Sequence, residues 1–242
     1  MILSGDCFEI LPSIEDNSVN LILVDPPYLI SKDSNFKKHS ETASKEMITK
    51  YASISIDFGD WDKNEINWDL LFKHYYRILK NGGTLIIFYD IWKSNVIKEF
   101  ANKYKFKQPR VCQWQKTNPV PVNSKTNYLS NSIEYFFTFV KGKNPTFNSE
   151  YDNGVYRYPI CHGKERYQHP TQKPLSLFID LIKKHSNPGD LVIDTFAGTG
   201  TTAHACLQTD RNYIVIERDE KYLEILKKRL NFSQEETKID NI

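Results

Sequence analysis

Two kinds of hydrophobic pattern alternate along this chain. Short unbroken apolar runs predict strands buried on both faces, because a parallel strand covered by helices loses the alternation of apolar and polar positions. Longer stretches with apolar residues three and four positions apart predict amphipathic helices. The predicted strands span Met1–Leu3, Val19–Val24, Thr84–Tyr89, Arg110–Gln115, Ser132–Val140, Leu191–Ile193 and Tyr213–Ile216. The predicted helices span Trp68–Leu79, Ile91–Tyr104, Pro174–His185, Thr201–Gln208 and Lys221–Leu230.

This alternation predicts an α/β fold with a doubly wound, mostly parallel sheet of seven strands. Ser132–Val140 is long and rich in aromatic residues, so we expect it to be an antiparallel strand at the edge of the sheet. The turn residues Asn81-Gly82-Gly83 are expected to end the first helix, and residues 187–190 the third. A length of 242 residues suits one α/β domain, which we favour over two small ones.

Two long polar segments, 29–66 and 141–169, interrupt this pattern without an apolar period of their own. Loops of this length inside a compact domain are usually functional. We expect the first to be a lid over the site and the second to be a small target-recognition insert.

Composition adds a general frame. Hydrophobic residues make up 40% and charged residues 26%, as in ordinary soluble proteins. The four cysteines have no paired spacing, which disfavours a zinc site and a disulfide framework, and we expect no metal. The apolar runs are too short to cross a membrane, and no basic and apolar leader opens the chain. These observations favour a cytoplasmic protein.

Charge is distributed unevenly, although the net charge is only +2. Residues 98–187 hold 15 Lys and Arg against 6 Asp and Glu, a balance of +9, whereas residues 1–97 balance to −4 and residues 188–242 to −3. Tryptophan and tyrosine residues are interspersed in this basic segment. Such a mixture is typical of a surface that binds nucleic acid, but it is equally typical of a solvated face over aromatic core residues.

A glycine turn follows one of the buried strands, in the stretch from Asp194 to Thr202. Gly198 and Gly200 remove side chains where a ligand must approach the backbone, and Thr201 opens a helix. The stretch also fits the GxGxxA pattern of dinucleotide-binding proteins, and Glu217, 19 residues after Gly198, stands where that pattern places a carboxylate for ribose. A nicotinamide or flavin dehydrogenase is therefore an alternative.

A second motif, Asp25-Pro26-Pro27-Tyr28, directly follows another buried strand. The prolines lack backbone N–H groups, so this turn presents the Asp25 carboxylate beside carbonyl oxygens that only accept hydrogen bonds. An exocyclic amine of adenine or cytosine carries two N–H donors that match these acceptors, and the Tyr28 ring offers a surface for stacking a base. Asp-Pro-Pro is also an ordinary turn sequence, but ligands bind at the carboxyl ends of parallel strands.

Together these motifs resemble the beta class of S-adenosylmethionine-dependent DNA amino-methyltransferases, in which the catalytic tetrapeptide precedes the cofactor turn. The resemblance covers nearly the whole chain. Besides the two motifs it includes Gly5-Asp6-Cys7, residues 58–62, Lys80 to Gly83, Trp114 to Pro119, Glu134-Tyr135, His169 to Pro174 and Ile216-Glu217. It implies a class I methyltransferase-like Rossmann fold in one domain with a circularly permuted motif order, catalytic in 1–140 and cofactor-binding in 170–242.

The resemblance also implies roles for individual residues. Asp25, Pro26, Pro27 and Tyr28 are the implied catalytic residues. The implied S-adenosylmethionine contacts are Asp6 and Cys7 at the adenine, Thr171 and Lys173 near the methionine carboxylate, Glu217 at the ribose, and Asp194, Phe196, Ala197, Gly198, Gly200, Thr201 and Thr202 in the turn. The expected DNA contacts are Trp61, Lys116, Asn118, Arg157 and Arg166. The turn departs from many relatives in having Thr195 where they have proline.

The expected activity is methylation of N6 of adenine in a flipped-out DNA base, because aspartate at the first tetrapeptide position is commoner in adenine enzymes. N4-cytosine methylation is the alternative, and a nucleic-acid-binding module without catalysis is a third class. Ring-carbon methylation is disfavoured because no cysteine follows a proline. The expected partners are DNA, a second copy in a homodimer and a companion restriction enzyme.

Overall fold

The computed structural model describes residues 1–27, 66–119, 131–167 and 171–239. The chain divides into two compact units, one formed by Met1–Pro26 with Trp68–Ile242 and the other by Pro27–Asn67. Tyr28, Trp61 and nearly all of the predicted lid at 29–66 lie outside the described residues. The fold of the first unit is described below.

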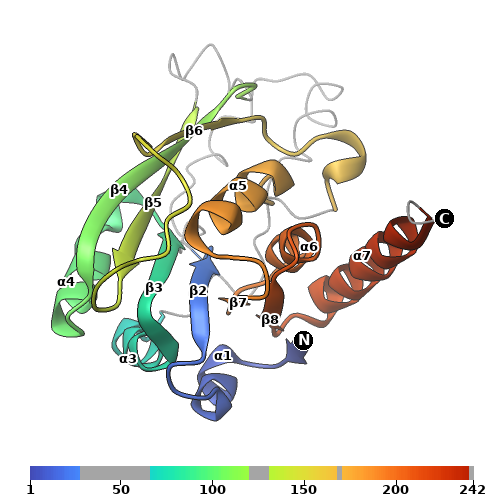
Figure 1. Cartoon of the computed structure of the whole chain (residues 1–242). Helices are drawn as coiled ribbons and strands as arrows, with labels where there is room; N and C mark the ends of the chain where they lie inside the picture. Colours follow the sequence, from blue (N-terminus) through green and yellow to red (C-terminus); the bar gives the residue numbers. More distant parts are fainter. Residues whose placement is uncertain (28–65, 120–130, 168–170, 240–242) are drawn as a thin grey trace, which may run out of the picture. The chain divides into compact units, whose positions relative to one another are not determined.

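The first unit is built on one sheet of eight strands, in the order β1-β8-β7-β2-β3-β5-β4-β6 (Figure 1). The strands are β1 (Ile2–Ser4), β2 (Val19–Val24), β3 (Leu79–Phe88), β4 (Lys107–Lys116), β5 (Ile133–Val140), β6 (Val155–Tyr158), β7 (Leu191–Asp194) and β8 (Asn212–Glu217). Every predicted strand is present. The β7 and β8 strands, from the C-terminal part of the chain, lie between β1 and β2 from its beginning.

The predicted α/β fold with a mostly parallel sheet is confirmed, but two details were wrong. The sheet has an eighth strand, β6, inside the segment predicted to be irregular. This four-residue strand pairs with β4 alone and carries too few apolar residues to form a recognisable run. The antiparallel strand β5 lies between β3 and β4 and not at an edge. Its side chains Phe136 to Val140 are buried, as expected for a strand whose two faces are covered.

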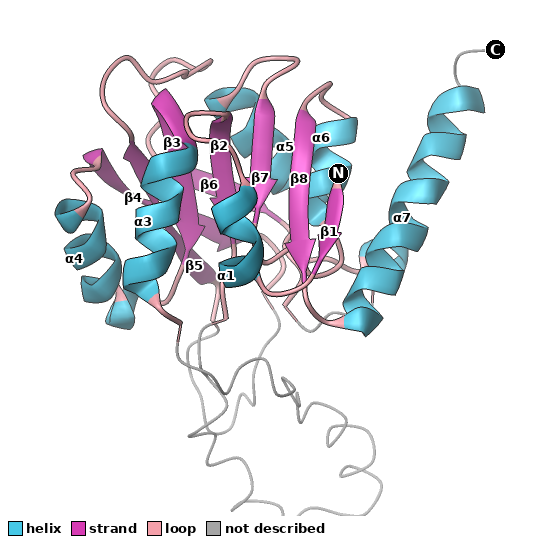
Figure 2. Cartoon of the chain, turned by 90° about the horizontal axis from the view of Figure 1, so that it is seen from below, coloured by secondary structure: helices cyan, strands magenta, loops and turns pink. Residues whose placement is uncertain are grey.

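Helices cover both faces of this sheet (Figure 2). One layer holds α1 (Cys7–Ile10), α3 (Trp68–Ile78) and α4 (Asn95–Lys103), and the other holds α5 (Leu175–His185) and α6 (Thr201–Leu207), with α7 (Glu220–Ile239) beside α6. Short 3-10 helices span Leu11–Ser13, Ile91–Lys93 and Gly163–Glu165. The five predicted helices are present, whereas the short α1 was not predicted. None of the helices in the described part of the chain is long and apolar enough to span a membrane.

The turn Asn81-Gly82-Gly83 does not end a helix as expected. Helix α3 ends at Ile78, and β3 starts at the next residue and runs through these glycines. Gly82 has a φ of +83° and donates its N–H to Lys141 O, and a Cβ on it would lie 2.6 Å from the carbonyl oxygen of Asn144. The glycine therefore permits a close approach of the segment after β5 to β3.

The topology creates one place where a ligand is expected. From β2 the chain moves to β3 on one side, and from β7 it moves to β8 on the other, so that the adjacent strands β2 and β7 form a topological switch point. Open α/β sheets bind ligands outside the carboxyl ends of the strands at such a point.

Candidate active site

Acidic residues stand at or just after the carboxyl ends of four neighbouring strands. Across the order β1, β8, β7 and β2 they are Asp6, Glu217, Asp194 and Asp25. Ser4 is in register with Glu217, and Asp194 with Val215, so the strand ends are aligned. The fold thus brings together carboxylates from both ends of the chain.

The glycine turn after β7 is held by Asp194 and by the neighbouring strand β8. Asp194 is fully enclosed and accepts hydrogen bonds from Phe196 N at 2.9 Å and from Thr202 Oγ1 at 2.5 Å. Ala197 N donates to Ile216 O at 3.0 Å. Burial raises the pKa of Asp194 to about 7, since it outweighs these two hydrogen bonds, and the negative charge of Asp25 adds to the rise.

Gly200 ends the turn in a conformation that suits glycine. Its φ is +81°, and a Cβ on it would lie 2.7 Å from Cγ of Leu226 in α7. Thr201 and Thr202 then begin α6 and are buried. The close packing of α7 therefore demands glycine at this position.

Thr195, the first residue after β7, is fixed by a side chain from another element. Its hydroxyl lies 2.5 Å from Tyr75 Oη of α3, and both residues are buried. This hydrogen bond links the first residue after β7 to α3, which lies in the helix layer on the other face of the sheet from α6.

Glu217 stands at the end of β8 against the same turn. Its Oε2 accepts from Gly198 N at 2.6 Å and its Oε1 from Asp219 N at 2.8 Å. Burial raises the pKa of Glu217, although these backbone N–H groups oppose the rise. At the end of β1, Asp6 caps α1 by accepting from Phe8 N, and Cys7 begins that helix.

Asp25, directly after β2, pairs with a lysine that comes from far along the chain. Lys173 Nζ lies 2.5 Å from Asp25 Oδ2, and the two residues are 148 positions apart. Lys173 is 5% exposed and also lies 3.2 Å from Glu134 Oε2. Its predicted contact with a methionine carboxylate stays a prediction, and so does that of the exposed Thr171.

Glu134 links this pair to a second lysine. It stands at the beginning of β5, which lies at the carboxyl ends of β3 and β4 because β5 runs in the opposite direction. Lys116 Nζ, at the end of β4, lies 2.9 Å from Glu134 Oε1. Lys116, which sequence reasoning expected to contact DNA, is thus partly buried and part of an ion-pair network.

The other expected DNA contacts lie near β4 and β6. Arg157 is exposed on β6 and its Nε donates to Gln115 Oε1 at 2.9 Å. Asn118 is exposed and its Oδ1 accepts from Ile160 N at 2.7 Å, which joins the end of β4 to the insert. Arg166 is exposed after the 3-10 helix. Their roles toward DNA stay predictions.

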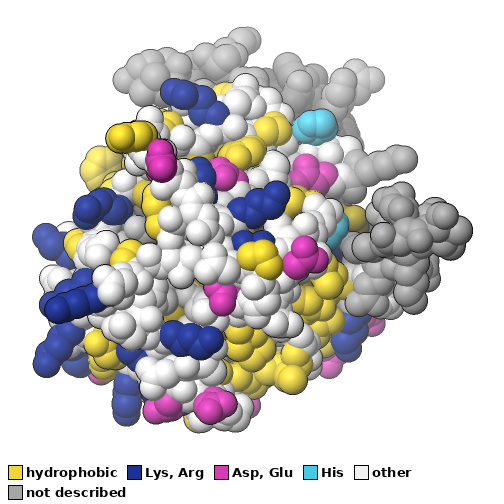
Figure 3. All heavy atoms as spheres, viewed as in Figure 1, with side chains coloured by type: hydrophobic (Ala, Val, Ile, Leu, Met, Phe, Trp, Pro, Cys, Tyr) yellow, Lys and Arg dark blue, Asp and Glu magenta, His cyan; other side chains and the backbone are white. Residues whose placement is uncertain are grey.

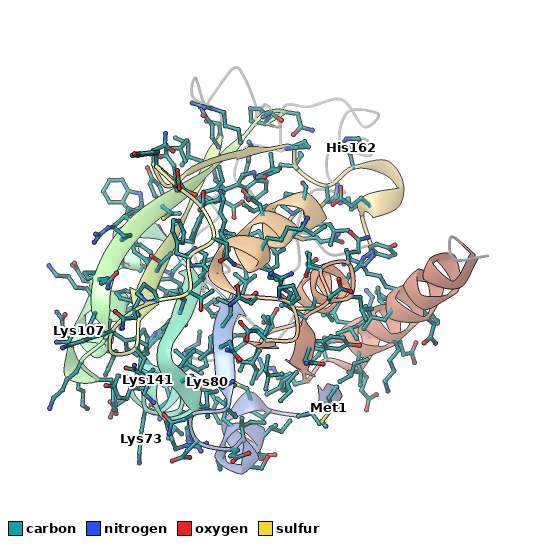
Figure 4. All side chains as sticks on the ribbon, viewed as in Figure 1. Met1, Lys73, Lys80, Lys107, Lys141 and His162 are labelled. Atoms are coloured by element: carbon teal, nitrogen blue, oxygen red, sulfur yellow. The ribbon has the colours of Figure 1, made fainter. Side chains whose placement is uncertain are left out.

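Exposed basic side chains gather over α4 and β4 (Figure 3). Figure 4 shows Lys73, Lys80, Lys107 and Lys141 at the end of the sheet where β3 and β4 begin. Because β4 spans Lys107–Lys116, about 30 Å of extended chain, these lysines lie at the end of the sheet opposite Asp25.

Among the aromatic residues of the basic segment, Trp114 and Tyr156 are buried and belong to the core.

The comparison that decides the family is a match to a family model. The model described as DNA methylase, of the N6/N4 group, matches residues 19–228. The chain belongs to the DNA methylase family. It is a DNA methyltransferase, and the predicted resemblance to the beta class of amino-methyltransferases is confirmed. The family match gives no support to the dehydrogenase alternative, nor to a binding module from another class.

Curated relatives and solved structures of DNA methyltransferases agree with this membership. The type II methyltransferase M2.MboI of Moraxella bovis is 31% identical over 94% of this chain and 86% of its own length. The type II methyltransferase M.HinfI of Haemophilus influenzae is 33% identical over 95% of this chain and 67% of its own length.

Among solved structures, M1.HpyAVI in complex with SAM has a TM-score of 0.70 and 29% identity, over 96% of this chain and 98% of that one. The cytosine-N4-specific PvuII DNA methyltransferase also has a TM-score of 0.70, but at 17% identity over 93% of this chain and 84% of that one, it shows the likeness of fold alone.

Sequence reasoning did not identify Tyr75 as a residue of the site. It included Glu134 in a motif but assigned no role to its side chain. Tyr75 sits on the apolar face of α3 and looks like an ordinary core residue. Glu134 is a single carboxylate at the start of an apolar run, and its position in the site follows only once β5 is known to be antiparallel and interior.

Burial raises the pKa of all four cysteine thiols, of Cys112 to about 11 and of Cys7, Cys161 and Cys206 to about 12, so none is a thiolate nucleophile at neutral pH.

Proposed function

We propose that this DNA methyltransferase transfers a methyl group from S-adenosylmethionine to N6 of adenine, with Asp25 as the acceptor that holds the amine. The observation that carries the proposal is the position of Asp25. Its carboxylate directly follows β2 at the switch point, beside the glycine turn after β7. Pro26 follows it. Because proline has no backbone N–H, this residue contributes only a carbonyl oxygen, which accepts hydrogen bonds.

The residues at this edge suit a cationic nucleoside such as S-adenosylmethionine. Asp6, Glu217 and Asp25 place carboxylates around the turn, and Asp194 lies beneath it. A dinucleotide would bring two pyrophosphate charges to this acidic edge, whereas a sulfonium and an ammonium group are attracted to it. The Glu217 carboxylate is of the kind that binds ribose hydroxyls at the end of this strand. M1.HpyAVI, which was solved with this cofactor, supports the same assignment.

When bound, S-adenosylmethionine supplies an electrophilic methyl group on sulfur. The protein must make a poor nucleophile attack it, because the lone pair of an aromatic amine is delocalised into the ring. Asp25 and the Pro26 carbonyl would each accept one amine N–H bond and hold the nitrogen toward tetrahedral geometry. As the N–CH3 bond would form and the S–CH3 bond break, with its electron pair going to sulfur, the amine becomes cationic. These acceptors stabilise the positive charge that develops in the transition state, and the methylated amine then releases one proton to solvent.

Access to the amine requires the base to leave the duplex. Flipping costs on the order of a few kcal/mol, which hydrogen bonds to Asp25 and stacking on an aromatic ring would offset. Tyr28 is the ring that we propose for stacking, and the segment 29–66, with Trp61, is the proposed lid. Tyr28 and residues 29–65 belong to the part of the chain outside the described residues.

Adenine is preferred over cytosine because position 25 is aspartate. A carboxylate is a stronger acceptor for an amine that becomes cationic than the serine hydroxyl commoner in N4-cytosine enzymes. N4-cytosine methylation remains the second candidate. The type II methyltransferases among the relatives further support a role in a restriction-modification system with a companion restriction enzyme.

The mechanism is tested by Asp25→Ala. We expect methyl transfer to DNA to be abolished, with the Kd for S-adenosylmethionine within about threefold of the wild-type value, because the acceptor is lost and the cofactor turn is not. Transfer is measured with tritiated cofactor and binding by calorimetry. Asp16→Ala, which removes a largely exposed aspartate paired with Arg77, is the control and should keep full activity. Turnover by Asp25→Ala at the wild-type rate would reject the proposed role.

A further inference from the structure

Four charged side chains form an alternating chain that ends at Asp25. Asp25 contacts Lys173 at 2.5 Å, Lys173 contacts Glu134 at 3.2 Å, and Glu134 contacts Lys116 at 2.9 Å. They come from four separate parts of the fold: the end of β2, the segment before α5, the start of β5 and the end of β4. No stretch of sequence keeps them together, so the arrangement depends on the tertiary structure.

The pKa shifts of Lys173 and Glu134 both favour the charged state of these side chains. Burial alone would lower the pKa of Lys173, but Asp25 and Glu134 together raise it above its ordinary value. Burial would likewise raise the pKa of Glu134, but Lys173 and Lys116 lower it. The Phe88 ring, centred 5.3 Å from Lys173 Nζ, adds a favourable face for the ammonium group. The Lys173 side chain is only 4% exposed, so solvent screens its charge poorly.

Such a lysine next to the acceptor creates an electrostatic problem for the reaction. A buried ammonium group 2.5 Å from Asp25 fixes that carboxylate, but it also cancels its charge and opposes the cation that forms on the amine. A second carboxylate on the same ammonium offsets this effect. Asp25, Lys173 and Glu134 together carry one net negative charge, and Lys116 at the outer end brings the sum of the four to zero.

We propose that Glu134 is a positioning residue that acts through Lys173 to keep Asp25 an effective acceptor for the reacting amine. Glu134 draws the Lys173 charge away from Asp25 and, with Lys116 behind it, remains ionised although it is partly buried. Lys173 is then the residue that sets the orientation of the Asp25 carboxylate. This inference rests on the proposed role of Asp25, and it assigns a function to a partly buried ion-pair network that the reaction scheme itself does not use.

Removing the Glu134 charge tests the inference. Glu134→Gln leaves two lysines with one carboxylate, so Lys173 pairs more strongly with Asp25. We expect kcat at saturating DNA to fall roughly tenfold, corresponding to about 1.4 kcal/mol of transition-state stabilisation. The Kd for S-adenosylmethionine, measured by calorimetry, should stay within about twofold, which also shows that the variant is folded.

The double variant Glu134→Gln with Lys116→Gln separates charge from structure. It removes one positive and one negative charge, so the excess positive charge near Asp25 is lost and kcat at saturating DNA should rise above that of Glu134→Gln, but it should stay below the wild-type value because Lys173 still lacks its second carboxylate. A purely structural role predicts the opposite order, because the double variant has lost more contacts. Glu134→Asp keeps the charge and should retain most of kcat, which provides a second test where the glutamine variant unfolds.

An ion pair remote from Asp25 provides the control. Lys184 pairs with Asp152 at 2.8 Å and Asp180 at 3.1 Å between β6 and α5. Asp180→Asn should lower stability without changing kcat. The inference is overturned if Glu134→Gln leaves kcat unchanged while Asp25→Ala abolishes it, or if the double variant is no faster than Glu134→Gln. If the wild-type chain itself methylates no DNA base, the proposed function fails instead.

Discussion

At the scale of single residues, the site holds groups in states that water would not favour. Asp194 is the clearest example, since burial raises its pKa to about 7 from an ordinary value of 3.8. The folded chain therefore holds this proton up to about pH 7, whereas the unfolded chain releases it near pH 4. In that interval the folded state binds more protons, so this group makes the protein less stable as pH rises.

Asp194→Asn should remove this dependence. The asparagine amide keeps an acceptor for Phe196 N and carries no charge. Between about pH 4 and pH 7 the wild-type free energy of unfolding should fall relative to that of the variant, by an amount on the order of 4 kcal/mol in total. Urea unfolding of both proteins at several pH values gives the difference. A difference that stays constant with pH would show that Asp194 is ionised in the fold throughout.

Alanine substitutions at Gly200 and Gly189 separate the cost of steric overlap from the cost of the backbone conformation. Gly200→Ala adds a Cβ 2.7 Å from Leu226 Cγ at a φ of +81°. Gly189 has the same φ of +81°, but a Cβ there would meet nothing within 4 Å. We expect Gly189→Ala to cost roughly 1–2 kcal/mol from the backbone alone, and Gly200→Ala to cost roughly 1–3 kcal/mol more from overpacking.

Chemical denaturation measures both glycine variants, and equal losses would show that α7 yields to the new methyl group. Sequence reasoning singled out this glycine from its motif, and its predicted contact with the cofactor stays a prediction. It had no means of identifying Leu226 as the neighbour, because that contact depends on how α7 packs.

At the scale of elements, strands were predictable where they are covered on both sides. β2, β3, β7 and β8 have unbroken apolar runs because helices cover both faces, and their positions follow from that pattern. β6 was missed because a four-residue strand paired along β4 alone has no such run. The place of β5 was also wrong, since a hydrophobic run records burial but not the direction or order of strands.

One hydrogen bond between elements carries a prediction. Tyr75→Phe removes the hydroxyl that binds Thr195 Oγ1 and leaves the ring of α3 in place. The free energy of unfolding should fall by roughly 1 kcal/mol, and the Kd for S-adenosylmethionine should rise severalfold because the turn after β7 loses its anchor. Tyr156→Phe removes a similar bond to Asp152 and is the matched control. It should lower stability alone, and equal cofactor affinities in the two variants would argue against the anchor.

At the scale of the whole molecule, the permuted order of motifs implies that segments from the first and last parts of the chain lie side by side. The structure places β7 and β8 between β1 and β2, so Asp25 and the glycine turn after β7 become neighbours. The pair of Asp25 and Lys173 was out of reach of sequence reasoning, because residues 148 positions apart reveal no contact through spacing. The basic residues near the start of β4 likewise lie away from Asp25, although charge counting alone suggested a DNA contact.

The small size of the insert at 141–169 leads to a prediction about assembly. We expect a homodimer in which the second copy supplies part of the DNA contact. Analytical ultracentrifugation with and without DNA should give the mass of two chains. A single chain that methylates DNA at full rate at all concentrations would contradict it.

The central claim is that this chain methylates N6 of adenine in DNA. The most direct test incubates the protein with S-adenosylmethionine and unmethylated DNA, digests the DNA to nucleosides and identifies the products by mass spectrometry. The account predicts N6-methyladenine with the wild-type chain and none with Asp25→Ala. N4-methylcytosine as the product, or no methylated base at all, would contradict it.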